Sequence, residues 1–186
     1  MRIIAGKHRG LHLAALGKGD AAAHLRPTSD RVRESLFNLL TNSAHGDPVT
    51  GARVLDLFAG TGALGLEALS RGAAHATFID DGAKARALIR ENVGKCRAEG
   101  VTKVFRRDAT RLGENRGAPF DLVFLDPPYG KGLGEKALAS ALAGGWLAEN
   151  ALIIWEEGAE IEPPGGVSPL DSRRYGDTTI TLLRKA

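Results

Sequence analysis

The segment Asp126-Pro127-Pro128-Tyr129 places a carboxylate, two rigid residues and an aromatic ring next to one another. Because proline fixes the backbone, the Asp126 side chain and the Pro127 carbonyl are expected to be two fixed hydrogen-bond acceptors. Such a pair can bind both N–H groups of an exocyclic amine, turn the nitrogen lone pair toward an electrophile and stabilise the charge that develops on nitrogen. The Tyr129 ring would stack on a base that has left its helix or loop. The segment therefore predicts methylation of a nucleobase amine, with Asp126, Pro127 and Tyr129 as the catalytic residues.

A second candidate site is the glycine-rich segment 56–65, which we expect at a turn from a strand into a helix. Glycines let a ligand approach the backbone closely, and the N-terminus of the helix offers free N–H groups. Gly60, Gly62 and Gly65 have the G-x-G-x-x-G spacing of dinucleotide sites, and Asp80 follows about 20 residues later, where a ribose-binding acid belongs. A nicotinamide dinucleotide is therefore one interpretation of this segment.

Asp56, an acid at the end of the preceding strand, favours a different ligand. Its carboxylate would repel a pyrophosphate but attract the methionyl ammonium and the sulfonium of S-adenosylmethionine. Asp80 can accept both ribose hydroxyls, and Asp108 with the backbone of Ala109 could bind the adenine amino group. The alternative for Asp56 is a structural acid that caps the turn. We expect S-adenosylmethionine as the cofactor.

Alternating strands and helices must position these residues. Apolar runs predict strands at 53–58, 74–79, 101–106, 120–125 and 151–156, separated by helices ending near 69 and spanning 83–98 and 133–143. Such βαβ units form an α/β fold with a parallel sheet that binds ligands at the carboxyl ends of its strands. The runs 167–175 and 178–184 flank Gly176-Asp177, which predicts an antiparallel hairpin at the sheet edge.

The N-terminal residues form a predicted extension to this domain. Runs at 2–6 and 11–15 indicate a hairpin with a basic turn, and a helix follows from about residue 30, capped by Thr28 or Ser29 and carrying Arg31 and Arg33 on its polar face. A loop at 42–51 suggests a boundary. We expect an extension of residues 1–45 and a methyltransferase domain of residues 46–186.

The charge distribution points to a polyanion. Residues 1–33 hold seven Lys and Arg against two Asp, a net charge of +5, which leaves −2 on the remainder. Basic residues gain affinity for nucleic acids by displacing counterions from phosphates. The alternative is a solvated basic surface without a partner.

Composition narrows the class of protein. The chain has 186 residues, 43% hydrophobic and 25% charged, which is typical of one soluble globular domain. A single cysteine, Cys96, excludes an internal disulfide framework and fits a reducing compartment. The sequence shows neither a signal peptide nor a membrane span. We expect a cytoplasmic protein.

Taken in chain order, the segment 56–65, Asp80, Asp108 and the segment 126–129 resemble the motifs of class I S-adenosylmethionine-dependent methyltransferases with the amino-methylating (N/D)PP(Y/F) motif. Segments 2–6, 25–38 and 62–72 narrow the resemblance to the RsmD family, the 16S rRNA guanine-N2 methyltransferases. Asp80 stands where that family usually has a longer glutamate, and Gly82 replaces a common polar helix cap.

The resemblance implies a Rossmann-like, seven-stranded, mostly parallel sheet and methylation of one guanine N2 in 16S rRNA, within the small ribosomal subunit or its assembly intermediate. We also expect a monomer, and no metal ion, because His8 and His12 lie in a strand-like segment without a second pair of ligands. The residues implied to bind the cofactor are Asp56, Phe58, Gly60, Thr61, Gly62, Asp80, Asp108 and Ala109. Those implied to face RNA are Lys7, Arg9, Arg26 and Arg31.

Three alternatives remain at this point. An adenine-N6 methyltransferase of nucleic acids would share the Asp126–Tyr129 motif, although 186 residues leave no room for a separate target-recognition domain. A nicotinamide-dependent oxidoreductase would use the glycine spacing. An RNA-binding assembly factor could retain the fold without catalysis.

Overall fold

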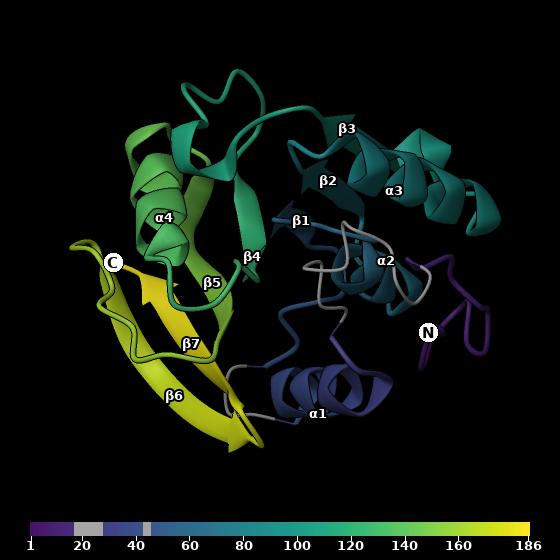
Figure 1. Ribbon diagram of the computed structural model, residues 1–186, viewed down its shortest axis with the longest axis horizontal. Coiled ribbons are helices and arrows are strands. Elements are labelled where there is room, and N and C mark those ends of the chain that lie inside the picture. Colours follow the sequence, from purple (N-terminus) through teal and green to yellow (C-terminus); the bar gives the residue numbers. More distant parts are fainter. Residues whose placement is uncertain (17–27, 43–45) are drawn as a thin grey trace.

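A seven-stranded sheet forms the centre of the protein (Figure 1). The structure is a computed structural model, and it describes residues 1–16, 28–42 and 46–186. The strand order is β3-β2-β1-β4-β5-β7-β6. The strands are β1 (Arg53–Leu57), β2 (His75–Ile79), β3 (Thr102–Phe105), β4 (Phe120–Leu125), β5 (Leu147–Glu157), β6 (Val167–Tyr175) and β7 (Thr178–Lys185).

Helices cover both faces of the sheet (Figure 1). The helices are α1 (Asp30–Thr41), α2 (Ala63–Ser70), α3 (Ala83–Lys95) and α4 (Leu133–Ala143), with short 3₁₀ turns η1 (Glu99–Val101) and η2 (Ala109–Arg111). One core packs Phe37 of α1, Leu66 of α2 and Ile89 of α3 against one face. A second core packs α4 and η2 against the other face. The α/β class with a three-layer arrangement is thereby confirmed.

The directions of the strands agree with the sequence pattern. β1 pairs in parallel with β2 and β4, β2 with β3, and β4 with β5, while β7 lies antiparallel between β5 and β6. The central strands are buried on both faces, which explains their continuous apolar runs. The predicted hairpin at the sheet edge is also confirmed.

Two element boundaries differ from the prediction by three residues or more. β5 begins at Leu147 rather than at residue 151, because Leu147 pairs with Phe120 ahead of an irregularity in the β4–β5 register. α3 ends at Lys95 rather than at residue 98, since Arg97 adopts a left-handed conformation with φ 51°. Pairing with a neighbouring strand and a single backbone angle are not visible in the apolar pattern.

The N-terminal arm, residues 1–16, lies along α2. Its two halves form one isolated antiparallel bridge between Arg2 and His12, so the arm is a tight turn rather than the predicted two-stranded hairpin. Near the N-terminal end of α2, the side chain of Asn92 from α3 holds the arm: the Ala14 N–H donates to Asn92 Oδ1 over 2.7 Å. At the other end, the Lys7 N–H donates to the carbonyl of Ser70 over 2.8 Å.

A buried ion pair fastens the arm and α1 to α2. Glu67 is fully buried, and its carboxylate accepts from the N–H groups of Ile4 at 2.8 Å and Ala5 at 3.1 Å. Arg33 and Arg71 pair with the same carboxylate at 3.4 Å and 2.9 Å. The prediction that Arg33 lies on the polar face of its helix is wrong, because the guanidinium is needed to neutralise Glu67.

The extension shares its core with the rest of the chain. Ile3 and Leu13 of the arm and Phe37 of α1 pack in the same cluster as Leu66 and Phe78. The division into residues 1–45 and 46–186 stays a prediction. No helix among the described residues is long and apolar enough to cross a membrane.

Gly6 and Gly10 provide a test of how closely the arm docks. Both have left-handed φ angles, 84° and 83°, but a Cβ at Gly6 would lie 1.9 Å from the carbonyl oxygen of Ser70. A Cβ at Gly10 would meet no atom of residues 1–16, 28–42 or 46–186 within 4 Å. We expect Gly10→Ala to cost about 1 kcal/mol of unfolding free energy, and Gly6→Ala at least about 2 kcal/mol more, because Ser70 must move. Urea unfolding of both variants measures the difference, and equal losses would contradict the docking.

Candidate active site

Acidic side chains gather at the carboxyl ends of the central strands. The acids that lie in or directly after a strand are Asp56 in β1, Asp80 after β2, Asp126 after β4, and Glu156 and Glu157 at the end of β5. β1 lies between β2 and β4, where the strand order reverses, which is where α/β sheets bind ligands. The topology therefore brings the glycine-rich turn and the Asp126–Tyr129 motif side by side.

The turn between β1 and α2 has the geometry that its glycines predict. Gly60 and Gly62 have φ angles of 61° and 80°, and Gly62 is the N-terminal cap of α2. Phe58 also lies in the left-handed region, with φ 55°, which is unusual for a bulky residue and typical of functional turns. Among the residues that the structure describes, a Cβ at Gly60 would have only the carbonyl oxygen of Phe58 near it, at 4.0 Å. The backbone at Gly60 is thus open to close approach by a ligand.

The buried side chain of Asp56 holds this turn through a hydrogen bond. It is 1% exposed, and its Oδ2 accepts from the N–H of Gly65 over 3.1 Å. Burial raises the pKa of Asp56 to about 8, and the nearby charge of Asp80 adds to this effect. Asp56 therefore does cap the turn, and its carboxyl also lies where a cationic ligand would favour its ionised form.

Asp80 and Asp108 hold the neighbouring loops. Asp80 accepts from Gly60 N–H at 3.0 Å with Oδ2 and from Gly82 N–H at 2.9 Å with Oδ1, and burial raises its pKa. Each of its oxygens keeps a lone pair that a hydroxyl could use. Asp108 caps η2 by accepting from the hydroxyl and the N–H of Thr110, which lowers its pKa.

Thr61 ties the turn to the arm. Its carbonyl accepts from Asn92 Nδ2 at 2.9 Å, and the same nitrogen donates to the carbonyl of Ala14 at 3.0 Å. The Thr61 hydroxyl lies 3.6 Å from the sulfur of Met1. The glycine-rich turn is thus held from the arm side as well as from the sheet.

The Asp126–Tyr129 motif is fastened at both ends. Asp126 Oδ2 lies 3.2 Å from the hydroxyl of Thr28, and the Tyr129 hydroxyl donates to Glu156 Oε1 over 3.1 Å and lies 3.0 Å from the Thr178 hydroxyl. Burial and the charge of Glu156 raise the pKa of Asp126 well above its ordinary value. Burial also raises the pKa of Tyr129. The structure therefore fixes the carboxyl group of Asp126 and the ring of Tyr129, while the role of the Pro127 carbonyl stays a prediction.

Comparison with known proteins decides the family. The family described as Conserved hypothetical protein 95 matches residues 1–184. The curated protein "Ribosomal RNA small subunit methyltransferase D" of Escherichia coli is 43% identical over 161 residues, covering 86% of this chain and 76% of that protein. The chain belongs to the RsmD family.

Relatives of full length support this assignment. YlbH of Bacillus subtilis is 38% identical, and the alignment covers 100% of this chain and 99% of that protein. The solved structure of yhhF from Escherichia coli superposes with a TM-score of 0.81 at 36% identity, covering 100% of this chain and 97% of that one. As an RsmD-family protein the chain is a methyltransferase, and the nicotinamide-dependent oxidoreductase is set aside.

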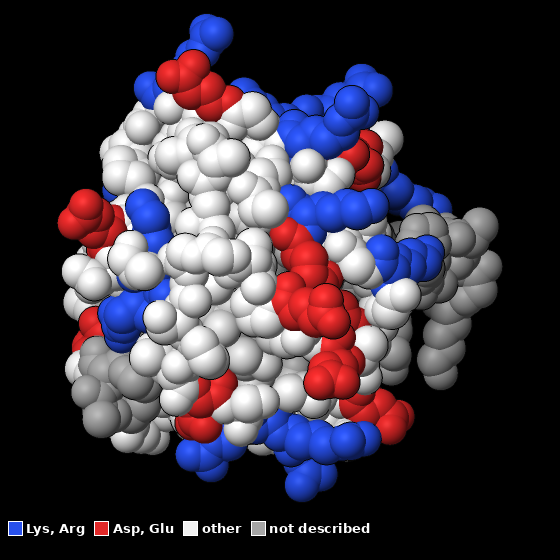
Figure 2. Space-filling model, turned by 90° about the vertical axis from the view of Figure 1, so that its left-hand side faces the viewer, with Lys and Arg blue, Asp and Glu red and all other residues white. Residues whose placement is uncertain are grey.

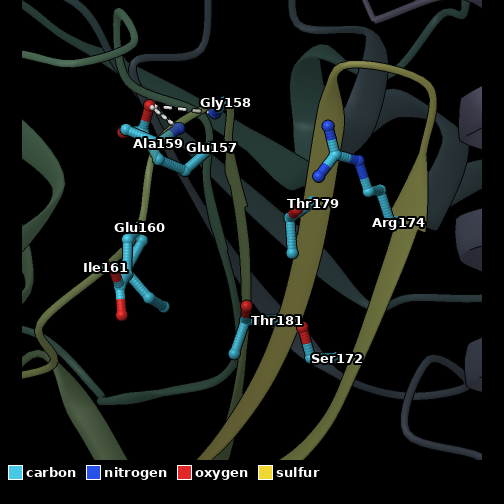
Figure 3. A pocket seen from close by; sticks show the side chains of 9 residues that line it. All are labelled: Glu157, Gly158, Ala159, Glu160, Ile161, Ser172, Arg174, Thr179 and Thr181. Atoms are coloured by element: carbon cyan, nitrogen blue, oxygen red, sulfur yellow. Dashed lines mark hydrogen bonds between the residues drawn. The ribbon is translucent and has the colours of Figure 1, made fainter.

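Beside the site, Glu157 organises a loop of this RsmD-family protein. Its Oε1 accepts from the N–H of Gly130 at 3.1 Å, Gly158 at 3.0 Å and Ala159 at 3.4 Å. Figure 3 shows the last two of these bonds above a surface depression of about 340 Å³, which Arg174 and Thr179 line from the other side. The chain segment after Tyr129 is thereby held against the end of β5.

The structure separates the predicted RNA-facing residues. Lys7 and Arg9 are exposed on the turn at the C-terminal end of α2, about 12 Å along that helix from Gly62. Arg31 is exposed in the first turn of α1, three residues after Thr28. Arg26 lies outside the described residues. Arg31 therefore lies within one helical turn of a residue that contacts Asp126, whereas Lys7 and Arg9 lie at the opposite end of α2 from Gly62.

Charge on the face that carries α4 and β6 is mixed. Figure 2 shows a band of acidic side chains on this face with Lys and Arg beyond it. Alternating signs attract a polyanion less than a continuous basic surface would. In the part of the chain that the structure describes, no group of three or more His, Cys, Asp or Glu side chains is arranged to hold a metal ion.

Sequence reasoning missed several residues that hold the site. Thr28 was expected to be a possible helix cap, but Ser29 caps α1 and Thr28 contacts Asp126. The predicted strand at 151–156 includes Glu156 without a role for its side chain, and Glu157 lies just beyond that range. Two consecutive acids at the end of an apolar run were the available signal for them, whereas nothing in the sequence indicates that Asn92 reaches the arm.

The raised pKa of Asp56 predicts a pH-dependent cost in stability. The folded protein keeps a proton on Asp56 up to about pH 8, whereas the unfolded chain releases it near its ordinary pKa of 3.8, so the free energy of unfolding falls as pH rises between these values. Asp56→Asn should therefore stabilise the ligand-free protein by roughly 1–3 kcal/mol at pH 8.5 and by less at pH 5. Thermal unfolding at both pH values measures this, with the exposed Asp177→Asn as control. The same change at both pH values would contradict the assignment.

Proposed function

We propose that the protein transfers the methyl group of S-adenosylmethionine to the N2 amine of one guanine in 16S rRNA, within the small ribosomal subunit or its assembly intermediate. It would act in the cytoplasm as a monomer without a metal ion. The observation that carries the proposal is the parallel pairing of β1 with β4, in which Leu57 lies opposite Leu125, so that Asp126 follows β4 next to the glycine-rich turn that follows β1. An acceptor for an amine thus adjoins the cofactor side of the sheet.

The residues present fit this cofactor. S-adenosylmethionine supplies an electrophilic methyl group and carries a sulfonium and an ammonium, which suit a turn lined by acids. The residues proposed to hold it are Asp56, Phe58, Gly60, Thr61, Gly62, Asp80, Asp108 and Ala109. In this arrangement Asp56 would face the ammonium, Asp80 the ribose hydroxyls and Asp108 the adenine.

The chemistry at the base falls to the Asp126–Tyr129 motif. Asp126 and the Pro127 carbonyl would accept the two N–H groups of the guanine amine and stabilise positive charge on nitrogen. The raised pKa suits Asp126 to take up the proton that the nitrogen loses. Tyr129 would stack on the base, with its ring held by the contacts of its hydroxyl to Glu156 and Thr178.

The relatives favour RNA over the remaining alternatives. The curated relatives of Escherichia coli and Haemophilus influenzae, 43% and 39% identical, are both named ribosomal RNA small subunit methyltransferase D. A shared substrate class would make Lys7, Arg9, Arg26 and Arg31 contacts to RNA phosphates. The N-terminal arm and the start of α1 would then lie between the body of the enzyme and its substrate.

Methyl transfer tests the proposal directly. Small ribosomal subunits that lack the modification should take up radiolabelled methyl from S-adenosylmethionine, and nucleoside analysis should identify N2-methylguanosine. Asp126→Ala should lower the rate by roughly 10²–10³-fold while the dissociation constant for the cofactor changes little, because the acceptor acts on the base.

The outcomes separate the parts of the proposal. N6-methyladenosine as the product would replace the substrate base. Full activity of Asp126→Ala would support a non-catalytic role for the motif. Cofactor binding without transfer to any small-subunit particle would retain the cofactor site and reject the rRNA substrate.

The arm provides a second prediction about RNA binding. Lys7→Ala with Arg9→Ala should reduce the slope of log K against log salt concentration by about 1.5, because about two phosphate contacts are lost. A double variant at Lys95 and Lys103, which are exposed outside the arm, removes the same charge and serves as the control. Equal slopes for the arm variant and the unmodified protein would remove the turn from the interface.

A further inference from the structure

Thr28 is a buried residue that precedes α1 but does not cap it. The Ser29 side chain accepts from the N–H of Val32 and caps α1, whereas the Thr28 hydroxyl turns toward the carboxyl ends of β4 and β5. Its Oγ1 lies 3.2 Å from Asp126 Oδ2 and 2.9 Å from Glu156 Oε2. Two neighbouring residues at the start of one helix thus have separate tasks.

Glu156 joins both ends of the Asp126–Tyr129 motif. It is 6% exposed, and its Oε1 accepts from the Tyr129 hydroxyl while its Oε2 lies against Thr28. Through Thr28 it reaches the acid of the motif, and directly it reaches the ring. A single side chain of β5 therefore sets the positions of the two groups that would contact the base.

Proton accounting restricts the ionisation of this cluster. A threonine hydroxyl has one proton to donate, yet its oxygen lies within hydrogen-bond distance of two carboxyl groups. If both were ionised, one of the two contacts would be a repulsion between oxygens. Both contacts become favourable when the two carboxyl groups share one proton. With this proton on Asp126, which its raised pKa favours in the ligand-free protein, Asp126 donates to Thr28 Oγ1 and the Thr28 hydroxyl donates to Glu156. With the proton on Glu156 the two bonds reverse, and Asp126 becomes the ionised acceptor that the guanine amine requires.

We propose that Thr28 and Glu156 are positioning residues of the methylation site, which keep Asp126 an ionised acceptor through one shared proton and hold the Tyr129 ring against the base. This inference rests on the proposed function. It assigns the residue just before the cap of α1 a part in positioning the acceptor, because the Thr28 hydroxyl lies within hydrogen-bond distance of both Glu156 and Asp126.

The surroundings of Thr28 support a fixed position. Its carbonyl accepts from Arg33 Nη1 at 3.5 Å, and Arg33 is itself held by Glu67. The charged groups that face Asp126 are Glu156 and Glu157 from β5 and Asp56 from β1, and all three raise its pKa, while the hydrogen bond from Thr28 lowers it. Thr28 thus provides the contact that favours an ionised Asp126.

Substitutions at Thr28 separate positioning from folding. We expect Thr28→Val, which keeps the shape but removes the hydroxyl, to lower kcat about 10–100-fold with cofactor affinity within about 2-fold. Thr28→Ser should recover most of this loss. Ser29→Ala is the matched control, because it removes the cap of the same helix and about 1 kcal/mol of stability without contacting Asp126, so its kcat should match that of the unmodified enzyme.

Substitutions at Glu156 test the shared proton. Glutamine resembles a protonated glutamate, since its amide can donate to Thr28 and accept from Tyr129, so Glu156→Gln should recover most of the activity that Glu156→Ala loses. At alkaline pH the unmodified enzyme should lose activity as the shared proton leaves, and Glu156→Gln should be less sensitive. This difference in the pH profile of kcat is one that a structural role alone does not produce.

Each outcome decides a separate point. Activity of Thr28→Val within about 3-fold of the unmodified enzyme, or Thr28→Ser as impaired as Thr28→Val, would overturn the role of the hydroxyl. Glu156→Gln as impaired as Glu156→Ala, or identical alkaline limbs, would overturn the shared proton. Absence of transfer by the unmodified enzyme would instead overturn the proposed function and the inference with it.

Discussion

A fully buried carboxylate has to be neutralised, and Glu67 meets this requirement with groups from three parts of the chain. Two backbone N–H groups come from the arm, one guanidinium comes from Arg33 of α1, and another from Arg71, the residue that follows α2. Removal of one partner would leave a buried charge without compensation. Arg33, which pairs with Glu67, also donates to the carbonyl of Thr28. The ion pair beneath the arm is thereby connected to the residue that contacts Asp126.

The acids at the carboxyl ends of the central strands differ from Glu67, because their burial is unfavourable in the ligand-free protein. Asp56, Asp80 and Asp126 lie close to one another with raised pKa values, and burial is the main cause for each. Folding has thus placed groups where they are costly in the ligand-free protein. Such a cluster is favourable once cations and N–H donors occupy it, which is why the arrangement points to a ligand rather than to stability.

Much of this organisation was predictable from the sequence. Runs of apolar residues located the central strands β1, β2, β4 and β5, because strands buried on both faces require them. The turn pair Gly176-Asp177 located the hairpin of β6 and β7, and the glycines at 60 and 62 located the turn after β1. The polar residues behind the site were not predictable in the same way. Arg33 has the spacing of a polar helix face, and Thr28 looks like a helix cap; their roles depend on Glu67 and Glu156, which are distant in sequence and meet them only in the folded chain.

The position of the arm along α2 has a consequence for substrate selection. The turn with Lys7 and Arg9 is separated from the glycine-rich turn by the length of that helix, about 12 Å. A free guanine nucleoside that entered the site could not reach the basic turn. On the proposed function, the enzyme would then accept a guanine only when it belongs to a polymer. That polymer must be long enough, and run in the right direction, to contact the methylation site and the basic turn at the same time.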